Sequence, residues 1–263
     1  MPSSIPALSF VFSLLSALLC FGLPAGLGVW VCRRHKGAGH AIMIGAFCFI
    51  VGAMVLEQLL HSLVLGAVPN LRQNPLLYGL YGCLAAGLFE ETARLPGLRA
   101  LCKRDAAPDI GLAYGVGHGG IEAVMIAGLG IVNNLMVMYM INSGQGESLV
   151  AGYTGDTLTL AQQQLTAMAE TPSPVYLAAG LERAYAIALH IALSMLIWMV
   201  VTRRLPMWGY GLAILLHALT NLPAALYQTG ILTGIWPTEL LGVLLTAGVV
   251  VLVVRLYRRP AKT

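Results

Sequence analysis

The chain contains few charges: only 10% of its 263 residues are Asp, Glu, Lys or Arg, whereas 58% are hydrophobic and the mean hydropathy is +0.79. Ordinary soluble domains carry about 25% charged residues, so this composition excludes that class. The sequence also lacks internal repeats, low-complexity tracts and a separate soluble domain. Because its apolar runs do not alternate as barrel strands do, we predict an all-α integral membrane protein that forms a single polytopic domain over residues 1–263.

Several familiar motifs are absent as well. The five cysteines include no Cys-x-x-Cys pair, and none of them falls in a predicted outer loop, so neither a disulfide framework nor a thiolate zinc site is indicated. The zinc-helix motif His-Glu-x-x-His is missing too. No cationic segment precedes the first apolar run, and cations follow it, so we expect a membrane span there rather than a cleavable signal peptide.

Seven apolar runs are long enough to cross a hydrocarbon core of about 30 Å, which requires roughly 20 helical residues. We predict transmembrane helices at about 5–31, 41–65, 75–98, 110–141, 175–201, 207–228 and 240–254.

The basic residues are concentrated after the first, third, fifth and seventh runs. The connections after the second, fourth and sixth runs contain Arg72 as their only basic residue. The positive-inside rule therefore predicts an N-terminus outside and a C-terminus in the cytoplasm of a cell membrane of the bacterial inner-membrane type. The net charge of +4 is then a topology signal and requires no nucleic-acid partner. The cations concerned are Arg33, Arg34, Lys36, Arg99, Lys103, Arg104, Arg203, Arg204, Arg255, Arg258, Arg259 and Lys262.

One predicted outer connection, residues 142–174, is long. Its middle part, 156–170, places leucines and a methionine among Gln and Thr, and Gly155-Asp156-Thr157 is suited to cap a short helix there. Two interpretations are open: a solvated surface helix, or an interfacial helix that covers a site in the membrane.

Five of the eleven acids lie inside apolar runs. A charge near the bilayer centre costs about 2.5–3.5 kcal/mol on insertion scales, so such residues persist where they pair, bind a ligand or face a cavity. Several together predict a chemical site within the membrane. The five acids are Glu57, Glu90, Glu91, Glu122 and Glu182.

Polar residues on the third to sixth runs lie at similar distances from the cytoplasmic ends of their helices, at about 1.5 Å per residue. We therefore expect these four helices, about 75–228, to point them into one cavity. This estimate assumes that Pro96 does not end the third helix early. The residues are Glu90, Glu91, His118, His190 and His217.

The spacing within each helix suggests roles. His118 and Glu122 are four residues apart and share a helix face, as do His217 and Asn221. One turn of helix can thus hold a ligand together with an amide that orients it or binds an oxyanion.

Glu90 and Glu91 are adjacent and point about 100° apart, so we expect them to differ in function. Arg94 lies within reach of either. We predict that one glutamate is a general base and that the other pairs with Arg94.

The fourth run also carries Gly111, Gly115, Gly119 and Ala123 at four-residue spacing, a small-residue ridge that allows close helix packing. These glycines either serve packing alone or also clear space beside His118.

Two further polar pairs remain open. Glu57 and His61 are four residues apart on the second run, and Glu182 and Arg183 are adjacent on the fifth. Each is either a structural pair or a participant in the chemistry.

Four motifs in order resemble the YhfC family of intramembrane metalloproteases, which is similar to the wider assembly of CAAX-processing, bacteriocin-processing and PrsW-type proteases. The resemblance covers most of the chain. The matching segments are Glu90-Glu91-x-x-Arg94, Tyr114-x-x-x-His118 with its extension Gly115-x-Gly117-His118-Gly119-Gly120-x-Glu122, Glu182-Arg183-x-x-Ala186-x-x-x-His190, and His217-x-x-x-Asn221.

This resemblance implies that a glutamate activates water for attack on a peptide carbonyl, with His118, His190 and His217 as metal ligands or oxyanion donors. Three histidines and a carboxylate suit a zinc ion with an open position. The implied substrates are membrane-linked peptides or prenylated or leader-bearing chains. Glu90, Glu91, Arg94, Glu122 and Asn221 are the implied catalytic residues, with Glu122 as a ligand or proton shuttle.

Two other classes compete with a protease. A proton-coupled transporter also uses buried acids and histidines, although such carriers usually show repeated halves. A non-enzymatic scaffold that retains a protease-like fold is the second alternative.

Overall fold

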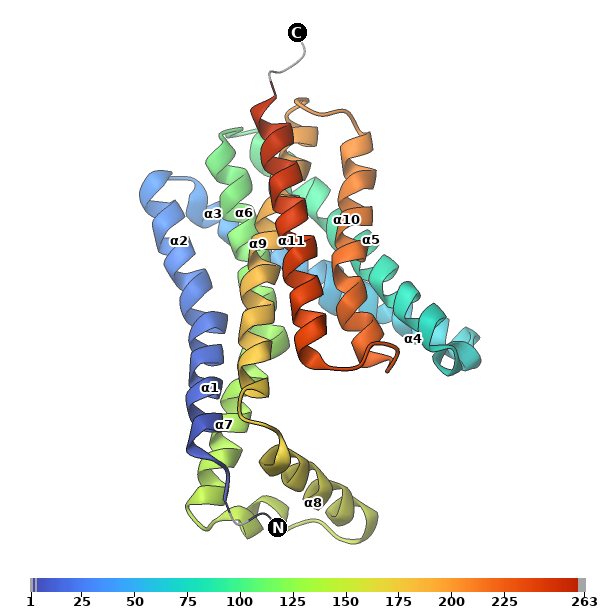
Figure 1. Ribbon diagram of the computed structural model, residues 1–263. Coiled ribbons are helices and arrows are strands. Elements are labelled where there is room, and N and C mark those ends of the chain that lie inside the picture. Colours follow the sequence, from blue (N-terminus) through green and yellow to red (C-terminus); the bar gives the residue numbers. More distant parts are fainter. Residues whose placement is uncertain (1, 3, 260–263) are drawn as a thin grey trace.

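The computed structural model describes residue 2 and residues 4–259, and this part of the chain forms a bundle of helices without a strand (Figure 1). The prediction of an all-α protein is therefore confirmed. Lys262, one of the cations used to predict topology, lies outside the described residues.

Three of the long helical segments contain a π-helical stretch in which the backbone gains an extra residue per turn. The first joins α1 (Ala7–Ala17), η1 (Leu18–Gly22) and α2 (Leu23–Arg34). The second joins α3 (Ala38–Phe49), η2 (Ile50–Glu57) and α4 (Gln58–Ala67), and the third joins α6 (Pro108–Glu122), η4 (Ala123–Gly128) and α7 (Leu129–Asn142).

The remaining helices are regular or short. They are the 3₁₀ turns η3 (Pro69–Gln73) and η5 (Gly146–Val150), and the α-helices α5 (Pro75–Cys102), α8 (Gly155–Glu170), α9 (Val175–Val201), α10 (Trp208–Gln228) and α11 (Ile235–Arg258).

Six helical segments are long and apolar enough to cross a membrane, and they match the predicted first, second and fourth to seventh runs. The third predicted run corresponds to α5, which has 28 residues but is not one of the six. Its two glutamates and two arginines lower its hydropathy. Helix α5 continues through Pro96, so this proline does not end it early.

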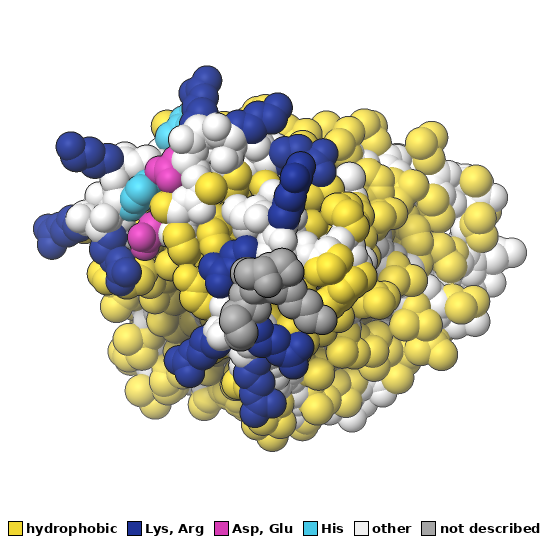
Figure 2. All heavy atoms as spheres, turned by 90° about the horizontal axis from the view of Figure 1, so that it is seen from above, with side chains coloured by type: hydrophobic (Ala, Val, Ile, Leu, Met, Phe, Trp, Pro, Cys, Tyr) yellow, Lys and Arg dark blue, Asp and Glu magenta, His cyan; other side chains and the backbone are white. Residues whose placement is uncertain are grey.

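The two chain termini lie at opposite ends of the bundle (Figure 1). Lys and Arg side chains gather at the end where the C-terminus lies (Figure 2). The cations at the C-terminal ends of α2, α5, α9 and α11 are therefore on one side of the molecule, as their placement in the sequence predicts. Which side of the membrane this end faces remains a prediction from the positive-inside rule.

Helix α9 forms the centre of the bundle. In its most apolar stretch 67% of the residues are buried, against 17–33% in the other five candidate spans. It packs against α6 on one side and α11 on another, and Leu193, Leu196 and Ile197 are fully enclosed. Residues that α9 directs inward are thus shielded from lipid.

Helix α6 packs unusually close to both α3 and α9. A Cβ atom at Gly117 would lie 2.0 Å from the Ile42 carbonyl oxygen of α3, and one at Gly115 would lie 2.5 Å from Ile191 Cα of α9. Gly119 meets His190 Cβ in the same way at 3.0 Å. The predicted small-residue ridge is therefore the contact that brings the backbone beside His118 against α9.

Polar contacts join the α2–α3 connection to the α5–α6 connection. His35 contacts Asp105, and Arg34 Nε lies 3.4 Å from Asp109 Oδ1. The Ala107 N–H and the His35 side chain both donate to Asp105 and lower the pKa of its carboxyl group. These contacts fix the end of α2 and the beginning of α6 relative to each other.

The long connection contains α8, as predicted, but the expected cap is not formed: Thr154 occupies the N-cap position and makes no side-chain capping bond. Leu165 and Met168 of α8 pack against a small cluster around Ile5 and Met138, at the ends of α1 and α7. Helix α8 therefore rests on the α1–α7 end of the molecule.

Candidate active site

The acidic pair comes from the middle of α5. Asn74 starts this helix by accepting a hydrogen bond from Leu77 N, and Pro75 suits the first turn. Glu91 and Arg94 are fully enclosed, whereas Glu90 is 6% exposed and lines a cavity. The two adjacent carboxylates therefore face different surroundings.

Glu91 is fully engaged by two partners. Its Oε2 lies 3.2 Å from Arg94 Nε, and its Oε1 lies 2.8 Å from His217 Nδ1 of α10. A carboxylate can only accept, so His217 donates through Nδ1 and directs Nε2 toward Glu90. Of the two glutamates, Glu91 is the one that pairs with Arg94.

Arg94 also connects α5 to α9. Its Nη1 donates to the His190 carbonyl and to Ser194 Oγ, both at 2.8 Å, and its Nη2 lies 2.9 Å from His190 Nδ1. Because a guanidinium only donates, Nδ1 accepts, and the proton of the neutral imidazole is on Nε2. That Nε2 contacts Glu122 of α6. Arg94 and Glu122 thus orient the His190 ring.

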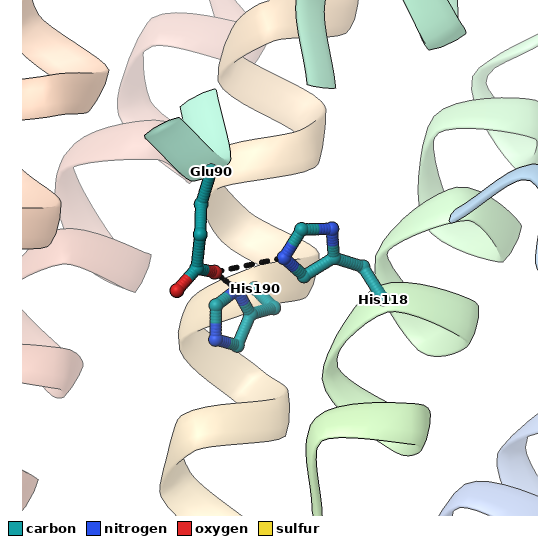
Figure 3. A group of neighbouring side chains, drawn as sticks. All are labelled: Glu90, His118 and His190. Atoms are coloured by element: carbon teal, nitrogen blue, oxygen red, sulfur yellow. Dashed lines mark hydrogen bonds and ion pairs between the residues drawn. The ribbon is translucent and has the colours of Figure 1, made fainter. Parts of the chain in front are cut away.

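Three imidazoles converge on the Glu90 carboxylate. His118 Nε2 lies 2.9 Å and His190 Nδ1 4.0 Å from Glu90 Oε2, and His217 Nε2 lies 3.9 Å from Glu90 Oε1 (Figure 3 shows Glu90, His118 and His190). The ring centroids of His118 and His190 are 4.8 Å apart, and those of His190 and His217 are 5.3 Å apart. The structure therefore brings these residues together, as their estimated depth predicted, but of the five only Glu90 lines the larger cavity beside them.

A second polar group adjoins this cluster. Arg183 Nη1 donates to Glu122 Oε1 and Arg183 Nη2 to Glu182 Oε1, both at 2.6 Å. Since Glu122 also contacts His190, the pair Glu182-Arg183 is connected to the histidine cluster.

A cavity of about 430 Å³ opens beside the cluster, a volume suited to a few residues of a peptide. Asn221 lines it, while the group that accepts the hydrogen bond from His217 Nδ1 is Glu91. No residue of α8 lines the cavity. The lining includes Phe49, Ala53, Met54, Glu57, Gln58, His61, Gly82, Cys83, Ala86, Glu90, Glu122, Ile126, Glu182, Arg183, Asn221, Ala224, Ala225 and Gln228.

The cluster has the donor set of a metal centre. Glu90, His118 and His190 each offer one ligand atom, and these atoms lie within 4.8 Å of one another. In addition, His217 Nε2 lies 3.9 Å from Glu90 Oε1, and in a neutral ring this nitrogen carries a lone pair that a cation between the two atoms would satisfy. Imidazole nitrogens with a nearby carboxylate suit zinc, so the residues fit such an ion.

One member of this site was missed in the sequence, and the role of a second residue was left open. Ser194 lies one turn after His190 and anchors Arg94, and its four-residue spacing from His190 was the available signal. Glu57 was placed outside the four-helix constellation, but it lines the same cavity as Glu90.

The fold and the site define a polytopic helical membrane protein with a buried glutamate-histidine cluster beside an internal cavity. The chain belongs to the YhfC family: the family model described as YhfC intramembrane metalloprotease matches residues 18–242. It is also 41% identical over 241 residues to the uncharacterized membrane protein YhfC of Bacillus subtilis (strain 168), covering 90% of this chain and 92% of that protein. No solved structure matches the chain. The family resemblance seen in the motifs is confirmed, and the chain is a multi-pass membrane protein.

Proposed function

We propose that the protein is a zinc-dependent intramembrane endopeptidase that hydrolyses peptide bonds of membrane-associated chains. The observation that supports this most is the convergence of three imidazoles on one carboxylate beside a peptide-sized cavity. Placing such a group inside a bundle is costly unless it performs chemistry or binds a ligand. The family description points to the same class of reaction.

In this proposal the zinc ligands are His118, His190 and His217. Glu91 supports His217 as a ligand, because its hydrogen bond to Nδ1 leaves Nε2 free to bind. His190 binds through Nδ1 once Arg94 releases that atom. The ion would supply Lewis-acid polarisation of the substrate carbonyl.

Glu90 is the proposed general base. It lines the cavity, whereas Glu91 is enclosed by Arg94 and His217. Glu90 takes a proton from the attacking water and delivers it to the leaving amine. The Asn221 side-chain amide, also on the cavity wall, donates to the developing oxyanion. Glu122 holds His190 and Arg183 and carries protons away from the site.

The test distinguishes the proposed zinc ligands from the proposed general base. Purified full-length protein is analysed for metal by inductively coupled plasma mass spectrometry, and cleavage of a membrane-peptide library is followed by mass spectrometry. His118→Ala and His217→Ala should lower zinc content and cleavage together. Glu90→Gln should retain zinc but lose about 10²–10⁴-fold in rate, because the amide keeps the shape without the base. Glu147→Gln, in an exposed turn, is the matched control.

Two outcomes would contradict the proposal. Loss of zinc in Glu90→Gln would make this residue a ligand instead of the base. Zinc-free parent protein that cleaves nothing in the library would exclude the protease, and the scaffold interpretation would replace it.

A further inference from the structure

The cavity carries more negative than positive charge. Four carboxylates line it, from Glu57, Glu90, Glu122 and Glu182, against the single guanidinium of Arg183. A divalent ion at the histidine cluster would offset two of these charges and still leave carboxylates in excess. A cavity of this kind attracts a positively charged ligand.

The four carboxylates differ in their partners. Arg183 holds Glu122 and Glu182 at 2.6 Å each, and Glu90 lies among the imidazoles. Glu57 contacts neither Arg183 nor the histidine cluster. Its Oε1 lies 3.2 Å from His61 Nε2, and His61 Nδ1 lies 2.7 Å from Tyr81 Oη.

The direction of these hydrogen bonds follows from chemistry. A carboxylate only accepts, so His61 Nε2 donates to Glu57; in the neutral form of the ring, the Tyr81 hydroxyl donates to His61 Nδ1. The imidazole can satisfy both bonds without a positive charge. Glu57 therefore receives one hydrogen bond, at Oε1, and no Lys or Arg of the described residues pairs with it.

The second oxygen of Glu57 is unpartnered. The residue is only 7% exposed, and within the described part of the chain no group donates a hydrogen bond to Oε2. The side chain nevertheless lines the cavity, where it is placed by the π-helical stretch η2 that ends at Glu57. A buried carboxylate with a free oxygen facing a cavity is costly without a ligand.

We propose that Glu57 binds a lysine or arginine side chain of the substrate, so that the enzyme selects segments with a basic residue near the scissile bond. This inference rests on the proposed protease function, because it places the scissile carbonyl at Glu90 in the same cavity. Glu57 is thus a specificity-determining residue.

The experiment compares two fluorescent Leu/Ala-based membrane peptides that differ at one position, lysine in one and its neutral analogue acetyl-lysine in the other. That position is scanned along the peptide. Binding to full-length protein in nanodiscs is measured by fluorescence anisotropy, and cleavage is measured in parallel. At the preferred position the parent should bind the lysine peptide at least about tenfold more tightly, as expected for a desolvated charge pair.

The variants assign this preference to Glu57. Glu57→Gln should reduce the ratio of the two affinities to about one, and Glu57→Lys should prefer a glutamate peptide over its glutamine counterpart. Glu147→Gln should keep the parent ratio. Because Glu57→Lys reverses the charge, it also tests the inference if Glu57→Gln does not fold.

The possible failures are distinguishable. Equal binding of both peptides at every position would overturn the inference, even if both were cleaved. A lysine preference that persists in Glu57→Gln would overturn it as well. A Glu57-dependent preference without any cleavage would support the binding site while the proposed protease function failed.

Discussion

At the residue scale, two adjacent glutamates of α5 have separate environments. Glu91 contacts Arg94 and His217 and is fully enclosed, whereas Glu90 reaches the cavity. The two glutamates are therefore distinguished by their neighbours and not by their residue type. Arg94 is central to this division, because it also bonds His190 and Ser194 of α9.

We predict that Glu91→Gln destabilises the protein by about 3–5 kcal/mol, since it leaves the enclosed Arg94 charge without its counter-ion. Glu90→Gln should change stability far less, because no arginine depends on Glu90. Denaturant unfolding followed by tryptophan fluorescence measures both. Equal stability of Glu91→Gln and the parent would show that the other hydrogen bonds of Arg94 suffice.

The residues of the site were largely predictable, but their pairings were not. Helical spacing and estimated depth grouped Glu90 with the three histidines, because inward-facing residues at the same depth of a helix bundle lie close together. Which glutamate pairs with Arg94 depends on the rotation of α5 against α9 and α10, and spacing does not determine this. The role of Glu57 stayed open because a π-helical stretch before it, which spacing does not reveal, changes the face on which it lies.

At the element scale, glycine contacts determine how closely α6 approaches its neighbours. Gly117 lies against the α3 backbone, and Gly45 of α3 faces the Tyr114 carbonyl, where a Cβ would be 2.2 Å away. His118 directly follows Gly117, and its backbone N would lie 3.1 Å from a Cβ atom at Gly45. The position of the histidine cluster therefore depends on backbone packing at α3–α6.

We predict that Gly117→Ala and Gly45→Ala each cost at least about 1–3 kcal/mol, because a methyl group would overlap a backbone carbonyl that cannot move independently. Thermal unfolding in detergent and zinc content are the measurements. Gly130→Ala is the matched control: a Cβ there meets nothing within 4 Å, and alanine improves helix propensity. A Gly117→Ala protein as stable as Gly130→Ala would contradict the close packing.

The elements themselves followed closely from hydropathy, and the ridge of Gly111, Gly115 and Gly119 was recognisable by its spacing. The partner of that ridge, α9, was not, because small residues indicate close packing without naming the neighbour. The function of α8 was also open, and its packing against Met138 depends on tertiary contacts.

At the scale of the whole molecule, α5 determines the number of membrane crossings. Its Glu90, Glu91 and Arg94 are buried in the bundle, while five leucines on its outer surface are 38–53% exposed, a stripe suited to lipid. With seven crossings the termini would lie on opposite sides, in agreement with their positions at opposite ends of the bundle (Figure 1). We therefore propose α5 as the seventh span. The leucines are Leu76, Leu77, Leu80, Leu84 and Leu88.

Reporter fusions test both the orientation and the α5 crossing. Alkaline phosphatase should be active when inserted within 156–170, and a green fluorescent protein fused after Arg259 should fluoresce, because cations concentrate at the C-terminal end (Figure 2). Paired insertions at 70–73 and at 103–106 flank α5 and should report the outer and the cytoplasmic compartment, respectively. If both insertions reported the same compartment, α5 would not cross the membrane, and the buried acids of the site would belong to a re-entrant helix. Reversed signals at all four positions would instead keep the seven spans and invert the protein.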